Sequence, residues 1–199
     1  MKKQNLVYGV GINDADYPTS NKKLVNGRYK LAWVCPFYKT WVNMLKRCYS
    51  KSYHQTRPTY RDCSVSPEWF TFSTFKTWME AQDWQGKQLD KDLLIKQNKI
   101  YSPDTCIFVT GEINKFTTDS AKTRGEYLIG VSFYKTNNNF VSTCRNPFTN
   151  KKECLGYFTS ELEAHQAWKN RKHELACQLA NSKYCNSSRL AEALQSRYL

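Results

Sequence analysis

The sequence lacks any apolar run that approaches the roughly 18 residues a membrane-spanning helix needs. Its opening stretch, MKKQNLVYGVGIND, carries two lysines but no apolar segment long enough for a signal peptide. Both absences argue against a membrane or secreted protein. We therefore expect a cytoplasmic chain with no membrane partner.

Cysteine is present, but the close pairing typical of zinc modules is missing. The eight cysteines stand at wide, irregular intervals, and no two of them form a CxxC pair. A cytosolic protein keeps its thiols reduced, so disulfides are not expected. Zinc ligation by Cys35, Cys48, Cys63 and Cys106 is one alternative. Buried thiols that act as small apolar side chains, with no cofactor, are the preferred interpretation.

Carboxylates are absent from one long stretch of the chain. None occurs between Asp16 and Asp62. The basic residues in that stretch are Lys22, Lys23, Arg28, Lys30, Lys39, Lys46, Arg47, Lys51, Arg57 and Arg61. The whole chain has a formal net charge of +13. A domain this basic most often binds a polyanion, and nucleic acid is the first candidate.

The first half of the chain predicts a mixed α/β module. Residues 36–49, PFYKTWVNMLKRCY, have Pro36 in the first helical turn and an apolar face at three- and four-residue spacing, which predicts a helix. Residues 66–82 predict a second helix, whose broad aromatic face we expect to lie in the core. A short apolar strand is expected at 106–109. The polar stretch 117–126 has the composition of a linker between domains.

The second half predicts three strands followed by a helix. Alternation and turn residues indicate strands at 127–135, 140–145 and 153–158. A long amphipathic helix is expected at 159–180, and a short last helix closes the chain. The predicted fold class is therefore α+β.

These C-terminal motifs resemble the AP2 DNA-binding domain. The resemblance lies in GVSFY (130–134), FVSTCR (140–145) and LGYFTSELEAHQAW (155–168), and covers about residues 127–180. It implies that the three-stranded antiparallel sheet enters the major groove while the helix braces its back. Strand alternation places Phe133, Phe140, Cys144 and Phe158 toward the helix. It places Ser132, Tyr134, Val141, Thr143, Arg145, Lys152 and Cys154 toward DNA, with Lys135 following the first strand.

Arg145 is the best candidate for bidentate guanine readout, and Lys152 for a phosphate or base contact.

The N-terminal motifs resemble a phage and prophage group allied to HNH endonucleases. They are WVNMLKRCY (41–49), PTYRDCSVSPEWF (58–70), LDKD (89–92) and NKIYSPDTCIFV (98–109). The resemblance implies a ββα-type module. In active members a histidine beside an aspartate activates water, and a downstream asparagine or histidine completes the site around one divalent metal.

This chain departs from that pattern. Its histidines are His54, His165 and His173, and Thr105 stands where the motif has asparagine. Because the general base and a ligand are both missing, we expect a degenerate, non-cleaving module. Asp90 and Asp92 would then make salt bridges or cap turns. The predicted phosphate contacts are Arg47, Lys91, Lys96 and Lys99.

The sequence therefore predicts a phage-encoded protein of the bacterial cytoplasm that binds double-stranded DNA. Its expected parts are an HNH-like module at 1–118, an AP2-like domain at 127–182 and a C-terminal helix at 183–199. One alternative is a Mg²⁺-dependent endonuclease, with the metal on Asp90 and Asp92 and His54 as the base. Another is a protein that binds and inhibits a host protein through exposed aromatic side chains.

Overall fold

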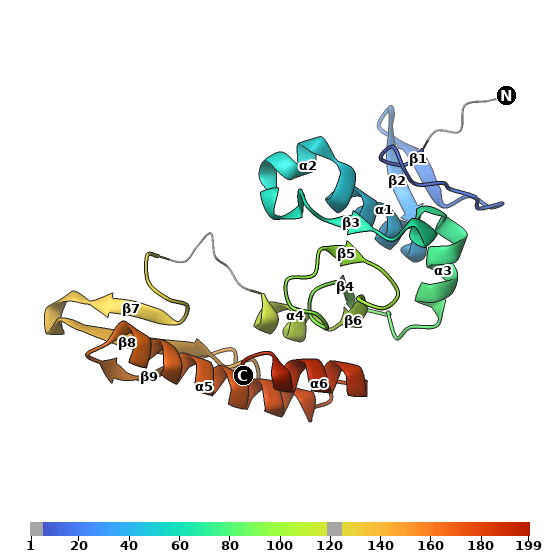
Figure 1. Ribbon diagram of the computed structural model, residues 1–199. Coiled ribbons are helices and arrows are strands. Elements are labelled where there is room, and N and C mark those ends of the chain that lie inside the picture. Colours follow the sequence, from blue (N-terminus) through green and yellow to red (C-terminus); the bar gives the residue numbers. More distant parts are fainter. Residues whose placement is uncertain (1–5, 119–124) are drawn as a thin grey trace. The chain divides into compact units, whose positions relative to one another are not determined.

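The computed structural model describes residues 6–118 and 125–199 as an α+β protein (Figure 1). The chain forms two compact units that divide between Phe108 and Val109. This division falls before the expected linker at 117–126, and residues 119–124 of that linker lie outside the described residues. In the described ranges, no helix has both the length and the apolar character needed to cross a bilayer.

The first unit combines short helices with two-stranded sheets. In chain order its elements are β1 (Ser20–Val25), β2 (Arg28–Val34), α1 (Pro36–Tyr49), α2 (Lys51–Thr56), η1 (Pro58–Tyr60), β3 (Ser64–Val65), η2 (Pro67–Phe70), α3 (Phe72–Glu80), β4 (Gln88–Asp90), β5 (Ile100–Tyr101) and β6 (Ile107–Val109), which spans the division. The strands pair as β1 with β2, β3 with β5 and β4 with β6.

The core of this unit lies between α1 and α3. The predicted helix at 36–49 is confirmed, and its expected apolar face of Trp41, Met44, Leu45 and Cys48 is buried. The Trp41 indole N–H donates to the backbone carbonyl of Trp69 at 2.7 Å, so this deeply buried polar group is satisfied. The aromatic face expected in the core is also buried there.

The expected continuous helix at 66–82 is wrong, because it breaks at Thr71. A short 3-10 helix, η2, precedes the break and α3 follows it. The backbone N–H of Ile12 donates to the Phe70 carbonyl at 2.7 Å, and the Phe72 N–H donates to the Ile12 carbonyl at 3.0 Å. Pairing with this distant segment holds Thr71 in an extended conformation, which a helix cannot accommodate.

The hairpin formed by β1 and β2 was not expected from the sequence. Its turn is Asn26-Gly27, and both residues have positive φ, at 51° and 73°. All residues of the two strands are exposed except Val34, which is half-buried. The hairpin is therefore a ribbon with two open faces rather than one wall of a core.

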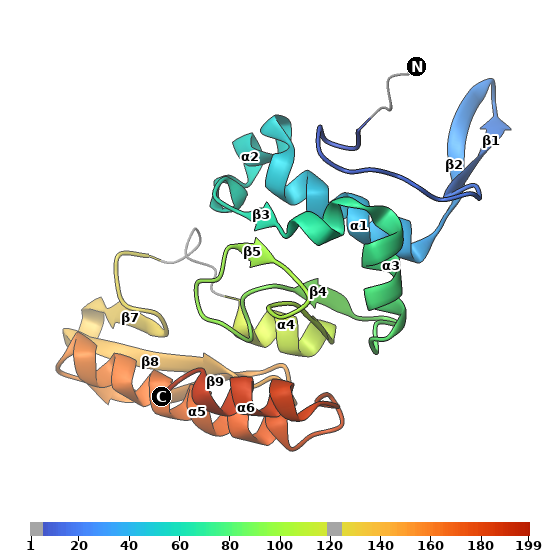
Figure 2. The same cartoon turned by 45° about the vertical axis from the view of Figure 1, so that its right-hand side comes forward.

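The second unit is a three-stranded sheet packed on a long helix. Its elements are α4 (Gly111–Thr117), β7 (Val131–Tyr134), η4 (Lys135–Asn137), β8 (Asn139–Arg145), β9 (Lys152–Phe158), α5 (Glu161–Ala180) and α6 (Ser188–Ser196). The sheet is antiparallel, as predicted, and its strand order is β7-β8-β9. Figure 2 shows α5 running along the back of this sheet with α6 beside it.

Two contacts set the sheet on the helix. Gly130, just before β7, has a φ of +84°, and the position of a Cβ there would overlap the Trp168 side chain of α5. On β9, the Glu153 carboxylate accepts from Arg171 of α5 at 2.9 Å and from Asn146 at 2.8 Å. These hydrogen bonds hold the pKa of Glu153 below its usual value. They also keep this carboxylate on the helix side of the sheet.

Candidate nucleic-acid interface

The face of the sheet turned away from α5 carries the polar and cationic residues that alternation predicted. Ser132, Tyr134, Arg145, Lys152 and Cys154 are exposed, and Val141 and Thr143 are half-buried. Cross-strand pairing brings Ser132 opposite Val141, Thr143 opposite Cys154 and Arg145 opposite Lys152. We call these residues, together with Tyr157, the outward face.

The other side of the sheet is also as expected. Cys144 is buried, and Phe133, Phe140 and Phe158 are half-buried. The strands are wholly within the described residues, and Glu153, the acidic residue they contain, lies on the helix side. The outward face therefore carries cations and hydroxyls without a carboxylate.

Tyr157 is a residue of this face that was not among the predicted DNA contacts. Its side chain is 58% exposed, and its ring lies 5.9 Å from that of Tyr134, centroid to centroid. The signal was available, because Tyr157 directly precedes the inward-facing Phe158 in a strand. Two adjacent aromatic rings add apolar contact area and hydroxyl groups to the cationic surface.

Arg145 is held in place by the turn between β8 and β9. Its Nη1 donates to the Asn150 backbone carbonyl at 2.8 Å and to the Asn150 Oδ1 at 3.2 Å. Asn150 itself adopts a left-handed conformation, with a φ of 55°. A guanidinium ordered before binding loses less conformational entropy when it contacts a ligand.

The two aspartates of the first unit stabilise a loop. The Asp90 Oδ1 accepts from the backbone N–H groups of Asp92 at 2.9 Å and Leu93 at 2.7 Å, which caps the turn after β4. Asp92 forms an ion pair with Lys91 at 2.8 Å. The predicted structural roles of this pair, capping a turn and forming a salt bridge, are confirmed.

Lys91 and Arg47, two predicted phosphate contacts, are engaged inside the first unit. Lys91 is buried and also donates to the Asn98 carbonyl at 2.9 Å. Burial alone would lower the pKa of Lys91, but the Asp92 carboxylate outweighs it and raises that pKa. Arg47 is half-buried and donates to the Tyr101 hydroxyl at 3.4 Å. A phosphate would reach either cation only after these bonds rearranged, whereas Lys96 and Lys99 are exposed.

His54, the base proposed for the nuclease alternative, lies in α2. Its Nε2 is 2.8 Å from the Arg47 backbone carbonyl. Because a carbonyl oxygen only accepts, Nε2 carries the proton in this arrangement. The remaining ring nitrogen, Nδ1, would have to act as the base.

The cysteines do not form the zinc site considered as an alternative. Throughout residues 6–118 and 125–199, no three His, Cys, Asp or Glu side chains gather closely enough to hold a metal ion. Burial raises the pKa of Cys48 and of Cys106 to about 12, so both thiols are neutral. Cys35 and Cys63 are buried as well. These four thiols are buried in the core of the first unit.

Comparison with known proteins leaves the family open. No family model, no curated protein and no solved structure matched this chain. The AP2-like and HNH-like resemblances are therefore supported by the sequence motifs alone.

Proposed function

We propose that this protein binds double-stranded DNA through the outward face of the β7-β8-β9 sheet. The observation that carries the proposal is a solvent-facing surface with Arg145 and Lys152 side by side, two exposed tyrosines and no carboxylate. A sheet with these side chains can present donors to base edges and phosphates together. The AP2-like motifs of the same strands point to the same use.

Four outward residues have a chemical role in this proposal. Arg145 donates to the O6 and N7 acceptors of a guanine, the contact that guanidinium geometry suits best. Lys152 neutralises a phosphate and releases a counterion, which makes affinity dependent on salt. Tyr134 and Tyr157 contribute hydroxyl donors and apolar contact with the sugar or the thymine methyl group.

For the first unit we propose a degenerate HNH-like module that adds nonspecific affinity. The pairing of β4 with β6 supports the two-stranded part of a ββα arrangement. Asp90 is occupied as the cap of a turn, which supports a structural rather than a catalytic role. Exposed Lys96 and Lys99 would contact phosphates. Two modules on one duplex raise the effective concentration of each, so modest affinities combine.

A mobility-shift assay with a matched charge control tests the proposal. The full chain is titrated onto a duplex at low salt beside the Arg145→Gln/Lys152→Gln double variant and the single variant Lys169→Gln. Lys169 lies on α5, outside the outward face. We expect the double variant to bind at least tenfold more weakly and Lys169→Gln to bind nearly as tightly as the parent. An unaltered affinity in the double variant would refute the assigned surface.

The same samples, incubated with plasmid and Mg²⁺, test the endonuclease alternative. Nicking that disappears in Asp90→Asn, while duplex binding persists, would contradict the proposal of a non-cleaving module and support the endonuclease alternative. No nicking by the parent chain would agree with a non-cleaving module.

A protein partner is the second candidate function, and the β1–β2 hairpin favours it. Lys22, Leu24, Tyr29 and Leu31 share one face of the ribbon by their register. Leu24 is 64% exposed, Tyr29 75% and Leu31 60%. Isolated hydrophobic residues on a surface are ordinary, but three neighbours on one open ribbon are typical of an interaction site. The test is retention of a host protein after nuclease treatment that is lost in Leu24→Ser/Leu31→Ser.

A further inference from the structure

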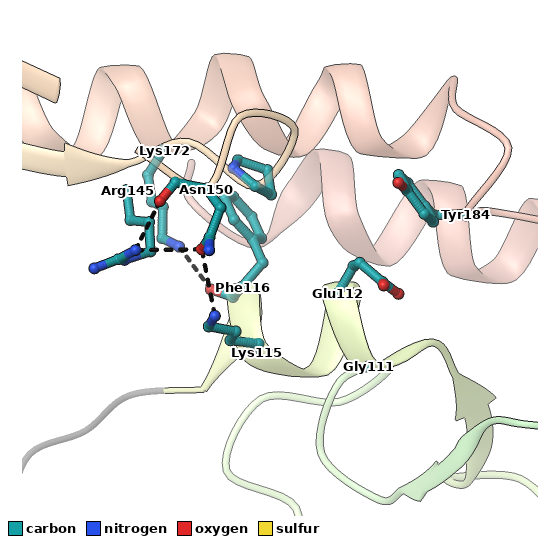
Figure 3. Close-up of a pocket in the computed structure, with 9 residues that line it drawn as sticks. Gly111, Glu112, Lys115, Phe116, Arg145, Asn150, Lys172 and Tyr184 are labelled. Atoms are coloured by element: carbon teal, nitrogen blue, oxygen red, sulfur yellow. Dashed lines mark hydrogen bonds between the residues drawn. The ribbon is translucent and has the colours of Figure 1, made fainter. Parts of the chain in front are cut away.

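A cavity of about 380 Å³ lies in the second unit, on the side of the β8–β9 turn (Figure 3). Its walls come from α4, the β8–β9 turn, α5 and the segment after α5. The volume is within the range of roughly 300–1,000 Å³ that small-molecule sites occupy. A ligand the size of a mononucleotide fits this space.

Three cationic side chains from three different elements meet at one end of the cavity. They are Lys115 of α4, Arg145 of β8 and Lys172 of α5. Figure 3 shows them grouped around Asn150, while Glu112 lies toward the opposite end with Tyr184. The positive end is thus separated from the carboxylate that lines the same cavity.

The hydrogen bonds that these three side chains make in the cavity have neutral acceptors. Lys115 and Arg145 both donate to the single Oδ1 of Asn150, at 3.4 and 3.2 Å. Lys172 donates to the Phe116 backbone carbonyl at 2.6 Å, and its ammonium lies 3.4 Å from the centroid of the Phe116 ring. An amide, a carbonyl and an aromatic ring stabilise a cation less than an anion does.

The cost of this arrangement falls on Lys172, which is half-buried and donates to a neutral carbonyl, whereas Lys115 and Arg145 are exposed. Burying a charge is unfavourable unless it is paired. A phosphate group supplies negative charge and several acceptor oxygens, and its charge-assisted hydrogen bonds are about twice as strong as neutral ones. A phosphate at the Asn150 end would offset the desolvation of Lys172 and could pair with Lys115 and Arg145 as well.

We infer that this cavity binds a phosphate group, presented by a nucleotide that extends from the Lys115–Arg145–Lys172 end toward Glu112. The Phe116 and Tyr184 rings supply apolar walls for a planar base. The carboxylate of Glu112 can accept from an exocyclic amine or a sugar hydroxyl. The phosphate could belong to a free mononucleotide or to a DNA strand. The inference does not require that the outward face bind a duplex.

Isothermal titration calorimetry on the full chain tests the inference with three probes. They are inorganic phosphate, deoxyadenosine 5′-monophosphate and deoxyadenosine, which lacks the phosphate. The parent is compared with Lys115→Gln and Lys172→Met, and with Lys169→Gln as the matched control on α5. Lys115 is exposed and makes one long hydrogen bond, so its replacement should leave the fold intact. Circular dichroism checks each variant.

We expect the monophosphate to bind, deoxyadenosine to bind far more weakly, and both cavity variants to lose about tenfold in affinity, equivalent to 1.4 kcal/mol. Lys169→Gln should keep the parental affinity. A strand phosphate as the source would instead appear as duplex binding that Lys115→Gln weakens, with a salt slope reduced by about 0.9. That outcome also supports the cavity as a phosphate site.

The inference is overturned if none of the phosphate probes binds and Lys115→Gln leaves duplex binding unchanged. It is also overturned if Lys169→Gln weakens the monophosphate as much as Lys115→Gln does, because the effect would then be general electrostatics. A chain that binds the monophosphate but no duplex would refute the proposed function and leave the cavity site standing.

Discussion

Replacement of Gly130 by alanine tests how closely the sheet packs against helix α5. Gly130 has a φ of +84°, a conformation that costs an L-residue about 1–2 kcal/mol. An added Cβ would also overlap Cδ1 and Cγ of Trp168, whose side chain is almost fully buried. Overpacking of this kind typically costs about 1–3 kcal/mol. Together these effects predict that Gly130→Ala destabilises the second unit by about 3 kcal/mol.

Two further glycines separate strain from overlap. Gly86 also has a positive φ, of 71°, but nothing lies within 4 Å of a Cβ placed there. Gly125 has open space and no positive φ. Urea unfolding of the full chain, followed by circular dichroism, should show a loss of about 1 kcal/mol for Gly86→Ala and less than about 0.5 kcal/mol for Gly125→Ala.

If Gly130→Ala unfolds at the same urea concentration as Gly125→Ala, neither backbone strain nor overlap with Trp168 limits residue 130. Equal losses in Gly130→Ala and Gly86→Ala would refute the contribution of overlap with Trp168. If the outward face binds DNA, Gly130→Ala should also weaken duplex binding, because β7 would shift relative to α5.

Three other predictions follow from the site. Asp90→Ala should destabilise the first unit by about 1–2 kcal/mol in urea, since it leaves two backbone N–H groups of the turn without their acceptor; Asp90→Asn, which keeps an acceptor oxygen, should cost less. Lys152→Gln should lower the slope of log affinity against log salt by about 0.9 in mobility shifts, and an unchanged slope would remove Lys152 from the phosphate contacts. Burial lowers the pKa of Lys172 to about 8 from 10.5, with Cys144 and Arg197 as charged or titratable neighbours. Between those pH values the unfolded chain binds more protons than the folded one, so the parent should gain stability relative to Lys172→Met as pH rises from 8 to 10; a constant difference would contradict this.

The parts of the fold predicted from sequence are those in which local pattern and tertiary burial agree. Helix α1 begins at Pro36 and buries the face that its spacing defines. The sheet of the second unit has one side against a helix, so its strands alternate, except where the register shifts between Ser142 and Thr143.

The missed elements had no such agreement. The β1–β2 ribbon buries neither face, so no core contact supports it, although Asn26-Gly27 is a strong hairpin turn signal and Tyr29, Leu31 and Trp33 alternate along β2. The break at Thr71 depends on backbone pairing with Ile12, and the sequence of residues 66–82 contains no local signal that predicts it. Likewise, the cavity depends on Lys172 reaching the Phe116 carbonyl, a contact between residues far apart in the chain.

Arg145 belongs both to the outward face and to the cavity, and the geometry lets one side chain serve both. A guanidinium has five N–H groups, and the two on Nη1 are directed at Asn150 in the cavity. Three remain on Nε and Nη2, which is enough for a bidentate contact with guanine. A phosphate in the cavity would replace Asn150 as the Nη1 acceptor and leave the other edge of the guanidinium in place. Because the phosphate would then fix the same rotamer that base reading requires, occupancy of the cavity should strengthen duplex binding rather than compete with it.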